Sequence, residues 1–239
     1  MYLISRFLVA SVLVVLFMSP VVRVSTTQSE SKSAPVVAQR EVPLTSFRSV
    51  ELRNGGKAIL HHGATQRVTV LKGSLDYTAV TIADGGRLVI DKCKSECPRG
   101  YDLEIEIVTP DVARISVADG GTIQSLGSFP RQAEIRVAVN NGGTIDIRSM
   151  SVDTVTASVD SGGRIFTRPQ TDMSASVVDG GVITYWGDAR VSKSIKGGGI
   201  VTRGTAAEAG QPISELSPPL SVPPVPPLPS IQPGRSPRR

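Results

Sequence analysis

The sequence predicts an all-β protein whose middle is a single-stranded right-handed parallel β-helix, a β-solenoid with short coils of about 18–22 residues. Two observations predict it: a recurring glycine doublet, and aliphatic residues at fixed distances from each doublet. The first glycines of the doublets are Gly55, Gly85, Gly120, Gly142, Gly162, Gly180 and Gly198. The last four intervals are 22, 20, 18 and 18 residues, and the first two are 30 and 35. We therefore expect seven stacked coils, with extra loops in the early ones.

Aliphatic residues flank every doublet with a period of two, which is the signature of a β-strand. Three residues before the doublets stand Leu52, Ile82, Val117, Val139, Val159, Val177 and Ile195. Three residues after them stand Ala58, Leu88, Ile123, Ile145, Ile165, Ile183 and Val201. Coils stacked about 4.8 Å apart would join these residues into one core. The residues between them are expected to face solvent, among them Arg114, Ser116, Glu134, Arg136, Thr154, Thr156, Ser174 and Ser176.

The residue before each doublet is polar or small and predicts a ladder of stacked turns. It is Asn54, Asp84, Asp119, Asn141, Ser161 and Asp179, and then Gly197. Asn and Asp tolerate the left-handed conformation and hydrogen-bond their own backbone. The alternative is a ladder of calcium sites, but calcium-binding β-rolls carry a further Asp in each turn that this repeat lacks. We expect a structural role, no bound metal and no cofactor.

The two ends of the chain differ in composition from the repeat. Residues 1–25 begin with a basic and then an apolar segment, typical of a signal peptide or an uncleaved anchor. Residues 26–45 are expected to form a linker and N-terminal cap, residues 46–204 the β-helix, and residues 205–239 a disordered proline-rich tail. The chain is thus expected to be exported to the periplasm, the outer membrane surface or the extracellular space, with no stable membrane span once the signal is removed.

Residues Phe47 to Val70 resemble the opening of the head GIN domain, a family of autotransporter adhesin heads. A Phe precedes an alternating strand, a glycine turn, a second strand ending in a glycine, and a Val-x-Val strand. The similarity continues through the later Gly-Gly-x-Ile coils to about Gly204. The resemblance implies a right-handed parallel β-helix on an exported bacterial protein with an adhesive or structural role, and it supplies no catalytic residues.

Cysteine and histidine are sparse. Cys93 and Cys97 are the only cysteines, and an even pair in an exported chain usually forms a disulfide, here a structural one closing a small loop. His61 and His62 are the only histidines. Neighbouring residues on a strand point to opposite faces, so the two imidazoles are not expected to share a metal.

Composition favours a binding or structural role over catalysis. The net charge is +5, but the basic residues are scattered among Asp and Glu without a basic stripe, and aromatic residues make up only 4% of the chain, so we expect no nucleic-acid binding. The expected protein is a non-enzymatic, adhesin-like or structural component of the cell envelope. Its expected partner is an envelope polysaccharide or another surface protein.

The rival interpretation is a β-helix that binds or cleaves polysaccharide through an acidic face. Asp102, Glu104 and Glu106 alternate along one predicted strand, so the three carboxylates would share a face that could hold calcium or perform acid–base chemistry. A solvated strand face is the simpler explanation. At the other end, Lys193 interrupts an otherwise aliphatic column and would discourage further stacking, so a capped monomer is expected.

Overall fold

The computed structural model describes residues 40–216, which form two large β-sheets with no α-helix in that range. The nine-stranded sheet contains, in spatial order, β1 (Arg40–Glu41), β4 (Arg67–Lys72), β7 (Glu104–Thr109), β3 (Lys57–His62), β9 (Thr122–Leu126), β11 (Thr144–Asp146), β13 (Arg164–Thr167), β15 (Val182–Tyr185) and β17 (Ile200–Arg203). The eight-stranded sheet contains β16 (Arg190–Lys196), β14 (Pro169–Val178), β12 (Val152–Asp160), β10 (Gln132–Asn140), β8 (Arg114–Ala118), β2 (Ser49–Arg53), β6 (Arg87–Asp91) and β5 (Ala79–Ala83).

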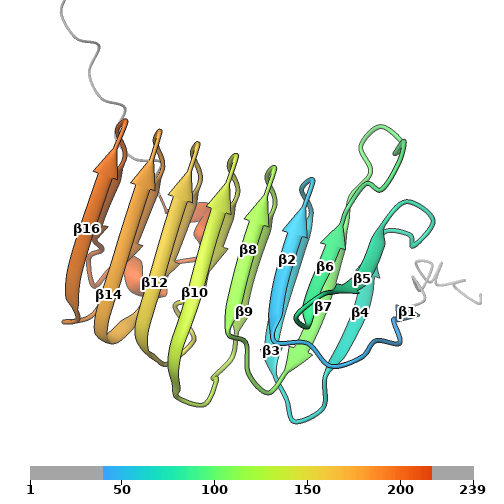
Figure 1. The fold of residues 1–239 in the computed structure, drawn as a ribbon, viewed down its shortest axis with the longest axis horizontal. Coiled ribbons are helices and arrows are strands. Elements are labelled where there is room, and N and C mark those ends of the chain that lie inside the picture. Colours follow the sequence, from blue (N-terminus) through green and yellow to red (C-terminus); the bar gives the residue numbers. More distant parts are fainter. Residues whose placement is uncertain (1–39, 217–239) are drawn as a thin grey trace, which may run out of the picture. The chain divides into compact units, whose positions relative to one another are not determined.

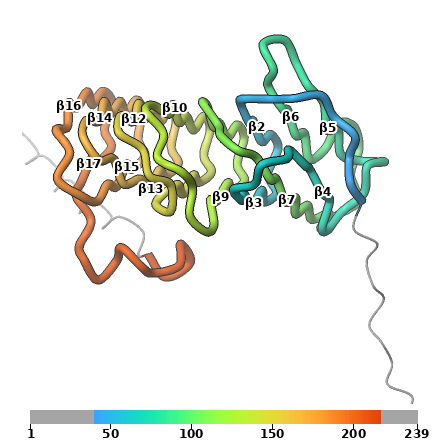
Figure 2. The backbone as a smooth tube through the Cα atoms, turned by 90° about the horizontal axis from the view of Figure 1, so that it is seen from below, coloured from blue at the N-terminus to red at the C-terminus, as the bar shows by residue number. Residues whose placement is uncertain are grey.

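From β8 onward the chain alternates strictly between the two sheets. Each strand pairs in parallel with its equivalent one winding later, as in β8, β10, β12, β14 and β16. The second sheet receives β9, β11, β13, β15 and β17 in the same way, and the two sheets form opposite layers (Figures 1 and 2). The parallel pairing therefore places equivalent residues of successive windings beside one another.

The core consists of aliphatic columns that run across the strands. Val117, Val139, Val159 and Val177 are register partners in turn, and all four are buried. The opposite sheet adds the column Ile123, Ile145, Ile165, Ile183 and Val201. Branched side chains pack well on a pleated surface, and burial of each one contributes about 1.5–3 kcal/mol. The predicted columns are therefore present from Leu52 to Val177 and from Ala58 to Val201, but Ile82 and Leu88 lie in the antiparallel pair β5–β6, and Ile195 is 47% exposed.

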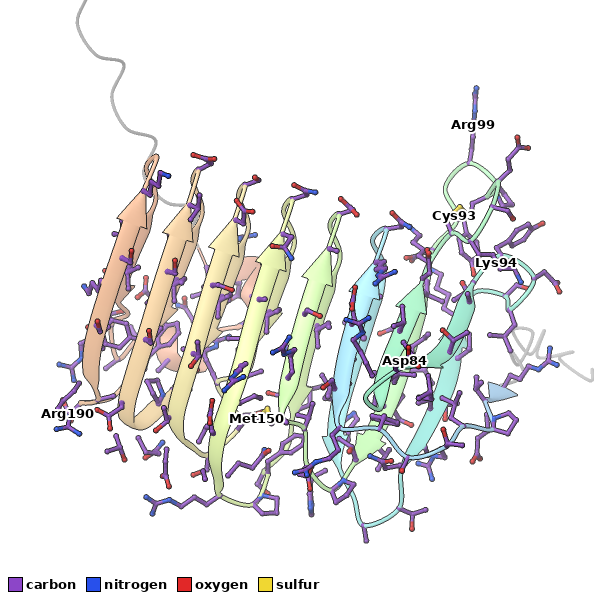
Figure 3. All side chains as sticks on the ribbon, viewed as in Figure 1. Asp84, Cys93, Lys94, Arg99, Met150 and Arg190 are labelled. Atoms are coloured by element: carbon purple, nitrogen blue, oxygen red, sulfur yellow. A yellow bond between two sulfur atoms is a disulfide. The ribbon has the colours of Figure 1, made fainter. Side chains whose placement is uncertain are left out.

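The doublet at Gly85 does not form a coil, which corrects the predicted stack of seven. It lies in a turn between β5 and β6, which pair antiparallel as a hairpin. Asp84 sits in this turn (Figure 3) and is not among the residues with positive φ. β2 consequently lies between β6 and β8, so the strand before the first doublet pairs directly with the strand before the third. The long early intervals contain this hairpin and the antiparallel strand β4.

The two ends of the stack are finished differently. At the N-terminal end, β1 pairs antiparallel with β4, and Val42 and Leu44 pack against the core. At the other end, β16 and β17 are edge strands, and Lys193 donates a hydrogen bond from Nζ to the carbonyl of Val201 across 3.0 Å. Lys193 therefore places a charged, solvent-exposed side chain at a position that is apolar in the other strands of this sheet.

Residues 204–216 turn back after β17 instead of leaving the domain. They contain two short 3-10 turns, η1 (Glu208–Gly210) and η2 (Ile213–Glu215), and Leu216 is buried against Phe166 and Trp186. The expected boundary of the tail at residue 205 is therefore too early. The proline-rich residues 217–239 and the signal-like residues 1–25 lie outside the described range. Within residues 40–216, no helix is long and apolar enough to cross a bilayer.

The second glycine of a doublet is needed because the previous winding lies against it. A Cβ at Gly143 would lie 2.6 Å from Cγ1 of Val117 and 2.9 Å from the carbonyl oxygen of Gly121. A Cβ at the first glycine, Gly142, would meet nothing within 4 Å. Both residues have positive φ, +83° at Gly142 and +104° at Gly143. The two positions thus share backbone strain on substitution but differ in packing.

We expect Gly142→Ala to lower the free energy of unfolding by about 1–2 kcal/mol, because a Cβ is strained at positive φ. Gly143→Ala should cost about 1–3 kcal/mol more, because its methyl group also overpacks the column below. Denaturant unfolding of the two variants measures the difference. Equal losses would show that successive windings do not approach as closely as described.

Candidate functional site

The predicted acidic face is a set of ion pairs. Glu104 lies 3.1 Å from Nζ of Lys57 on the neighbouring strand β3, and Asp102 lies 2.8 Å from Nζ of Lys72 on β4. The hydrogen bond from Lys72 is the main cause that lowers the pKa of Asp102 below its usual value. Both pairs are exposed to solvent. Both carboxylates are therefore neutralised by cations, and the pKa of Asp102 is lowered, whereas that of a catalytic acid would be raised.

Glu106 is also paired, with Nη2 of Arg67 and Nε2 of His61, each at 3.8 Å. His62 packs its ring edge-on against Phe129 at 5.9 Å between centroids. No group of three His, Cys, Asp or Glu side chains within residues 40–216 could hold a metal ion. The acidic strand thus offers a solvated, charge-balanced surface.

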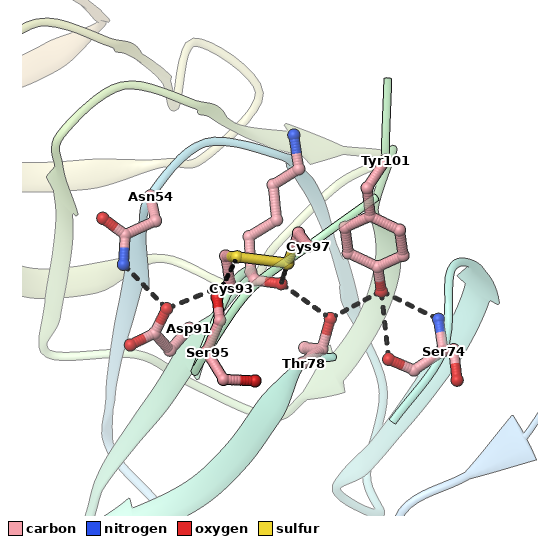
Figure 4. Close-up of a disulfide and its surroundings, with 9 residues drawn as sticks. Asn54, Ser74, Thr78, Asp91, Cys93, Ser95, Cys97 and Tyr101 are labelled. Atoms are coloured by element: carbon pink, nitrogen blue, oxygen red, sulfur yellow. Dashed lines mark hydrogen bonds between the residues drawn. A yellow bond between two sulfur atoms is a disulfide. The ribbon is translucent and has the colours of Figure 1, made fainter. Parts of the chain in front are cut away.

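Cys93 and Cys97 form a disulfide in the loop after β6, the pairing that the sequence predicts (Figure 4). Asp91 links this loop to the first coil, because one carboxylate oxygen accepts hydrogen bonds from the amide of Asn54 and from the Cys93 backbone N–H, at 2.8 and 3.1 Å. The hydroxyl of Tyr101 then ties the neighbouring loop, accepting from the Ser74 N–H at 2.8 Å. The disulfide therefore lies among hydrogen bonds that connect neighbouring loops to the first strands.

The residues before the doublets, apart from Asp84, follow the ends of neighbouring strands of the eight-stranded sheet. Five of the six named residues have positive φ, namely Asn54, Asp119, Asn141, Ser161 and Asp179. Asn141 donates a hydrogen bond from Nδ2 to Oδ1 of Asp119 in the previous winding, at 2.9 Å. This geometry is that of a stacked turn, and Asp84 is excluded from it by the hairpin.

A hollow of about 330 Å³ beneath the C-terminal segment brings together Asp146, Arg148, Ser125 and Ser149. Both charged side chains are buried, 9% exposed for Arg148 and 4% for Asp146. Nε and Nη2 of Arg148 donate to the two oxygens of Asp146, at 2.9 and 2.8 Å. The two serine hydroxyls bond to each other at 2.7 Å, so neither serine is paired with a base.

Arg148 fastens residues 204–216 to the nine-stranded sheet. Its guanidinium donates to the carbonyls of Glu208 and Gln211, at 3.0 and 2.9 Å. It also lies over the rings of Phe166 and Trp186, at 5.6 and 5.2 Å from their centroids. All N–H groups of the guanidinium point to acceptors in the protein. Arg148 therefore holds residues 204–216 against the nine-stranded sheet. The repeat pattern does not reveal this role, because the segment lies outside the repeat.

A different cluster lies on the solvent face of the eight-stranded sheet. Register places Arg87 of β6, Ser49 of β2, Arg114 of β8 and Arg136 of β10 in one line across the strands. We call these four residues the arginine row. Thr156, Ser174 and Ser192 continue the line on β12, β14 and β16. The three arginines are far apart in sequence, so only the register of the strands brings them into one line.

The carboxylates near the arginine row do not balance its charge. Glu51, only 12% exposed, lies 2.5 Å from Nε of Arg53 and 3.3 Å from Nε of Arg87. The Arg87 contact is electrostatic, since that N–H makes no hydrogen bond among the described residues. Arg136 pairs with Glu134 of its own strand, at 3.0 Å.

Arg114 has no carboxylate within 4.0 Å in residues 40–216, and its register partner on β10 is another cation, Arg136. The two side chains line a hollow of about 370 Å³ with Glu51, Arg87 and Thr156, and a second of about 390 Å³ with Ser49 and Glu134. This surface therefore presents arginine and hydroxyl groups beside only two carboxylates, and among the arginines Arg114 has no carboxylate partner within the described residues. It is the site with the clearest capacity to bind a ligand.

Comparison with known proteins identifies solved structures of low sequence identity. No family model matches the chain, so none supports the head GIN resemblance, and no curated protein matches it. A "putative adhesin" from Bacteroides fragilis is 17% identical over 69% of this chain and 94% of its own, with a TM-score of 0.35. A "putative lipid binding protein" from Parabacteroides distasonis is 15% identical over 70% and 96%, with a TM-score of 0.31. A "putative cell adhesion protein" from Clostridium sporogenes is 10% identical over 69% and 97%, with a TM-score of 0.34. At such TM-scores the likeness assigns no function to this chain.

We expect Arg148→Ala to lower the free energy of unfolding by about 3–5 kcal/mol, because it leaves the buried Asp146 carboxylate without its partner. It should also release residues 204–216 to proteolysis. Arg131→Ala is the matched control, because Arg131 is 67% exposed and its pair with Asp153 is worth about 1 kcal/mol or less. Denaturant unfolding and limited proteolysis with mass spectrometry measure both. Protection of residues 204–216 in Arg148→Ala would contradict the anchoring role.

Proposed function

We propose that this chain is a non-enzymatic exported protein of the cell envelope that binds its partner through the solvent face of the eight-stranded sheet, in an adhesin-like or structural role. The observation that carries the proposal is the arginine row. There, three arginines of different windings converge on hollows of the open face, and one of them, Arg114, has no carboxylate within 4.0 Å among residues 40–216. The expected partner is an envelope polysaccharide or another surface protein.

The fold within this proposal is a single-stranded right-handed parallel β-helix over residues 46–204. The strict alternation of strands from β8 to β17 supports it, because each winding contributes one strand to each sheet. The right hand is supported by the general rule that crossovers between parallel strands of one sheet are right-handed in about 98% of cases. The polar end at Lys193 supports a capped monomer.

Export is supported by the sequence of residues 1–25 and by the disulfide, since disulfides persist mainly outside the cytoplasm. The proposed destinations are the periplasm, the outer membrane surface and the extracellular space. In the same organisation residues 26–45 form a linker and cap, and the proline-rich tail begins after residue 216.

A non-enzymatic role is supported by the state of the candidate acids. Asp102, Glu104 and Glu106 each have a basic partner, and the pKa of Asp102 is lowered, which suits a permanent charge and not a proton donor. The alternative function is polysaccharide binding or cleavage. Within this alternative, the hollows of the arginine row favour polysaccharide binding over cleavage, because they offer space for a polar chain.

A screen of the full chain against glycans and purified envelope polymers and proteins tests this function. We expect saturable binding to at least one partner and no new reducing ends, because the candidate acids Asp102, Glu104 and Glu106 all have basic partners. An unfolded sample of the same chain is the control and should not bind. Shortening of a polymer would establish the enzymatic alternative, and failure of the folded chain to bind any envelope component would contradict the proposal.

A further inference from the structure

We infer that the arginine row is a site for an extended anionic glycan, one that carries carboxylate or sulfate groups and lies across the strands. This inference rests on the proposed function and names its ligand class and its site. It follows from the geometry of Arg87, Arg114 and Arg136, the hydroxyl groups that continue their line, and the charge left uncompensated there.

The spacing of the cations suits a chain with regularly repeated anions. Neighbouring strands lie about 4.8 Å apart, so Arg114 and Arg136 emerge one spacing apart, and Arg87 emerges about 10 Å from Arg114. Guanidinium groups bind carboxylate and sulfate-like oxygens through paired N–H donors. A polymer that runs perpendicular to the strands would meet all three cations without bending.

The line of the arginine row continues as hydroxyl groups. Thr156 and Ser174 follow Arg136 in register, and Ser158 and Ser176 form a parallel line two residues along the same strands. Hydroxyls both donate and accept, and so match the alcohol groups of a sugar. The site would therefore hold anionic groups at the row and neutral sugar hydroxyls beyond it.

Other polyanions fit this surface less well. Binding to a lipid surface usually includes insertion of apolar side chains, and the exposed large apolar residues of the described chain, Leu126, Ile195 and Ile200, do not belong to these lines. Single-stranded nucleic acid needs aromatic platforms for its bases, and neither line contains an aromatic residue. A polyanion that also carries hydroxyl groups matches both the arginines and the hydroxyl side chains of this face.

The arrangement also carries a cost that a purely structural surface would avoid. Like charges directly opposite each other on neighbouring strands are destabilising, and Arg114 and Arg136 are such a pair. Removing both charges should leave the melting temperature unchanged or raise it. A gain in stability together with a loss of binding is the combination expected of a ligand site.

The test is calorimetric titration of the full chain with dextran sulfate, polygalacturonate and neutral dextran. Arg114→Gln/Arg136→Gln should weaken binding of the anionic polymers about ten-fold or more, since it removes two charge-assisted contacts. Arg67→Gln/Arg203→Gln removes the same charge from the nine-stranded sheet and should change affinity less than three-fold. The two polymers separate a preference for sulfate from one for carboxylate. Neutral dextran should not compete.

Three results would overturn the inference. Equal weakening in both double variants would assign binding to net charge, and undiminished binding in Arg114→Gln/Arg136→Gln would place it elsewhere. Tighter binding to vesicles of phosphatidylglycerol and phosphatidylcholine than to either polymer would assign the row to a lipid surface. In all three cases the proposed non-enzymatic envelope-binding role stands, because it fails only if the folded chain binds no envelope component, whereas undiminished binding in Arg114→Gln/Arg136→Gln would also remove its assignment to the eight-stranded sheet. Arg114→Lys/Arg136→Lys keeps the charge without the paired donors and should give an intermediate affinity.

Discussion

Close, in-register stacking of successive windings is the constraint on which the rest of the structure depends. The second glycine of each later doublet lies against a valine and a carbonyl of the winding before, leaving no space for a Cβ. That contact sets the aliphatic residues of one winding beside those of the next, so that a chain with thin strand pairs acquires one continuous core. The left-handed residue in front of every doublet except that at Gly85 closes the turn that makes this contact.

The same constraint determines what the surface can present. Since side chains alternate along a strand, fixing Ile115 and Val137 in the interior forces Arg114 and Arg136 outward at the same height. The two arginines are 22 residues apart in sequence yet are direct neighbours on adjacent strands. The ligand-binding capacity of the surface is therefore a consequence of core stacking, not of a local motif.

Much of this architecture could be predicted from periodicity. The valine column and the turns at Asp119, Asn141, Ser161 and Asp179 follow from the repeat, because only glycine and small polar residues tolerate the backbone of the turn. The hairpin at Gly85 could not, since an antiparallel pair and a coil turn share the same alternating pattern. The distinguishing signal is the length of the neighbouring intervals.

Less of the candidate site than of the fold could be predicted from the sequence. Arg114 and Arg136 each stand six residues before a doublet, so an alignment by offset would have brought them together. Arg87 joins them only because β6 lies beside β2, which depends on the hairpin. The anchoring role of Arg148 depends on carbonyls of residues 208–211, whose sequence has no periodic signal.

Cross-linking between windings is the most direct measurement of the stacking register. Thr156 and Ser174 are register partners on β12 and β14, so cysteines at both positions should lie within the Cα separation of about 4.4–6.8 Å that a disulfide spans. Thr156 and Ser176 are two residues out of register and about 8 Å apart, too far for the same bond. Under mild oxidation of the full chain, peptide mass spectrometry should find a rapid disulfide in Thr156→Cys/Ser174→Cys and little in Thr156→Cys/Ser176→Cys. Equal or faster oxidation of the second pair would contradict the stacking on which both the core and the arginine row depend.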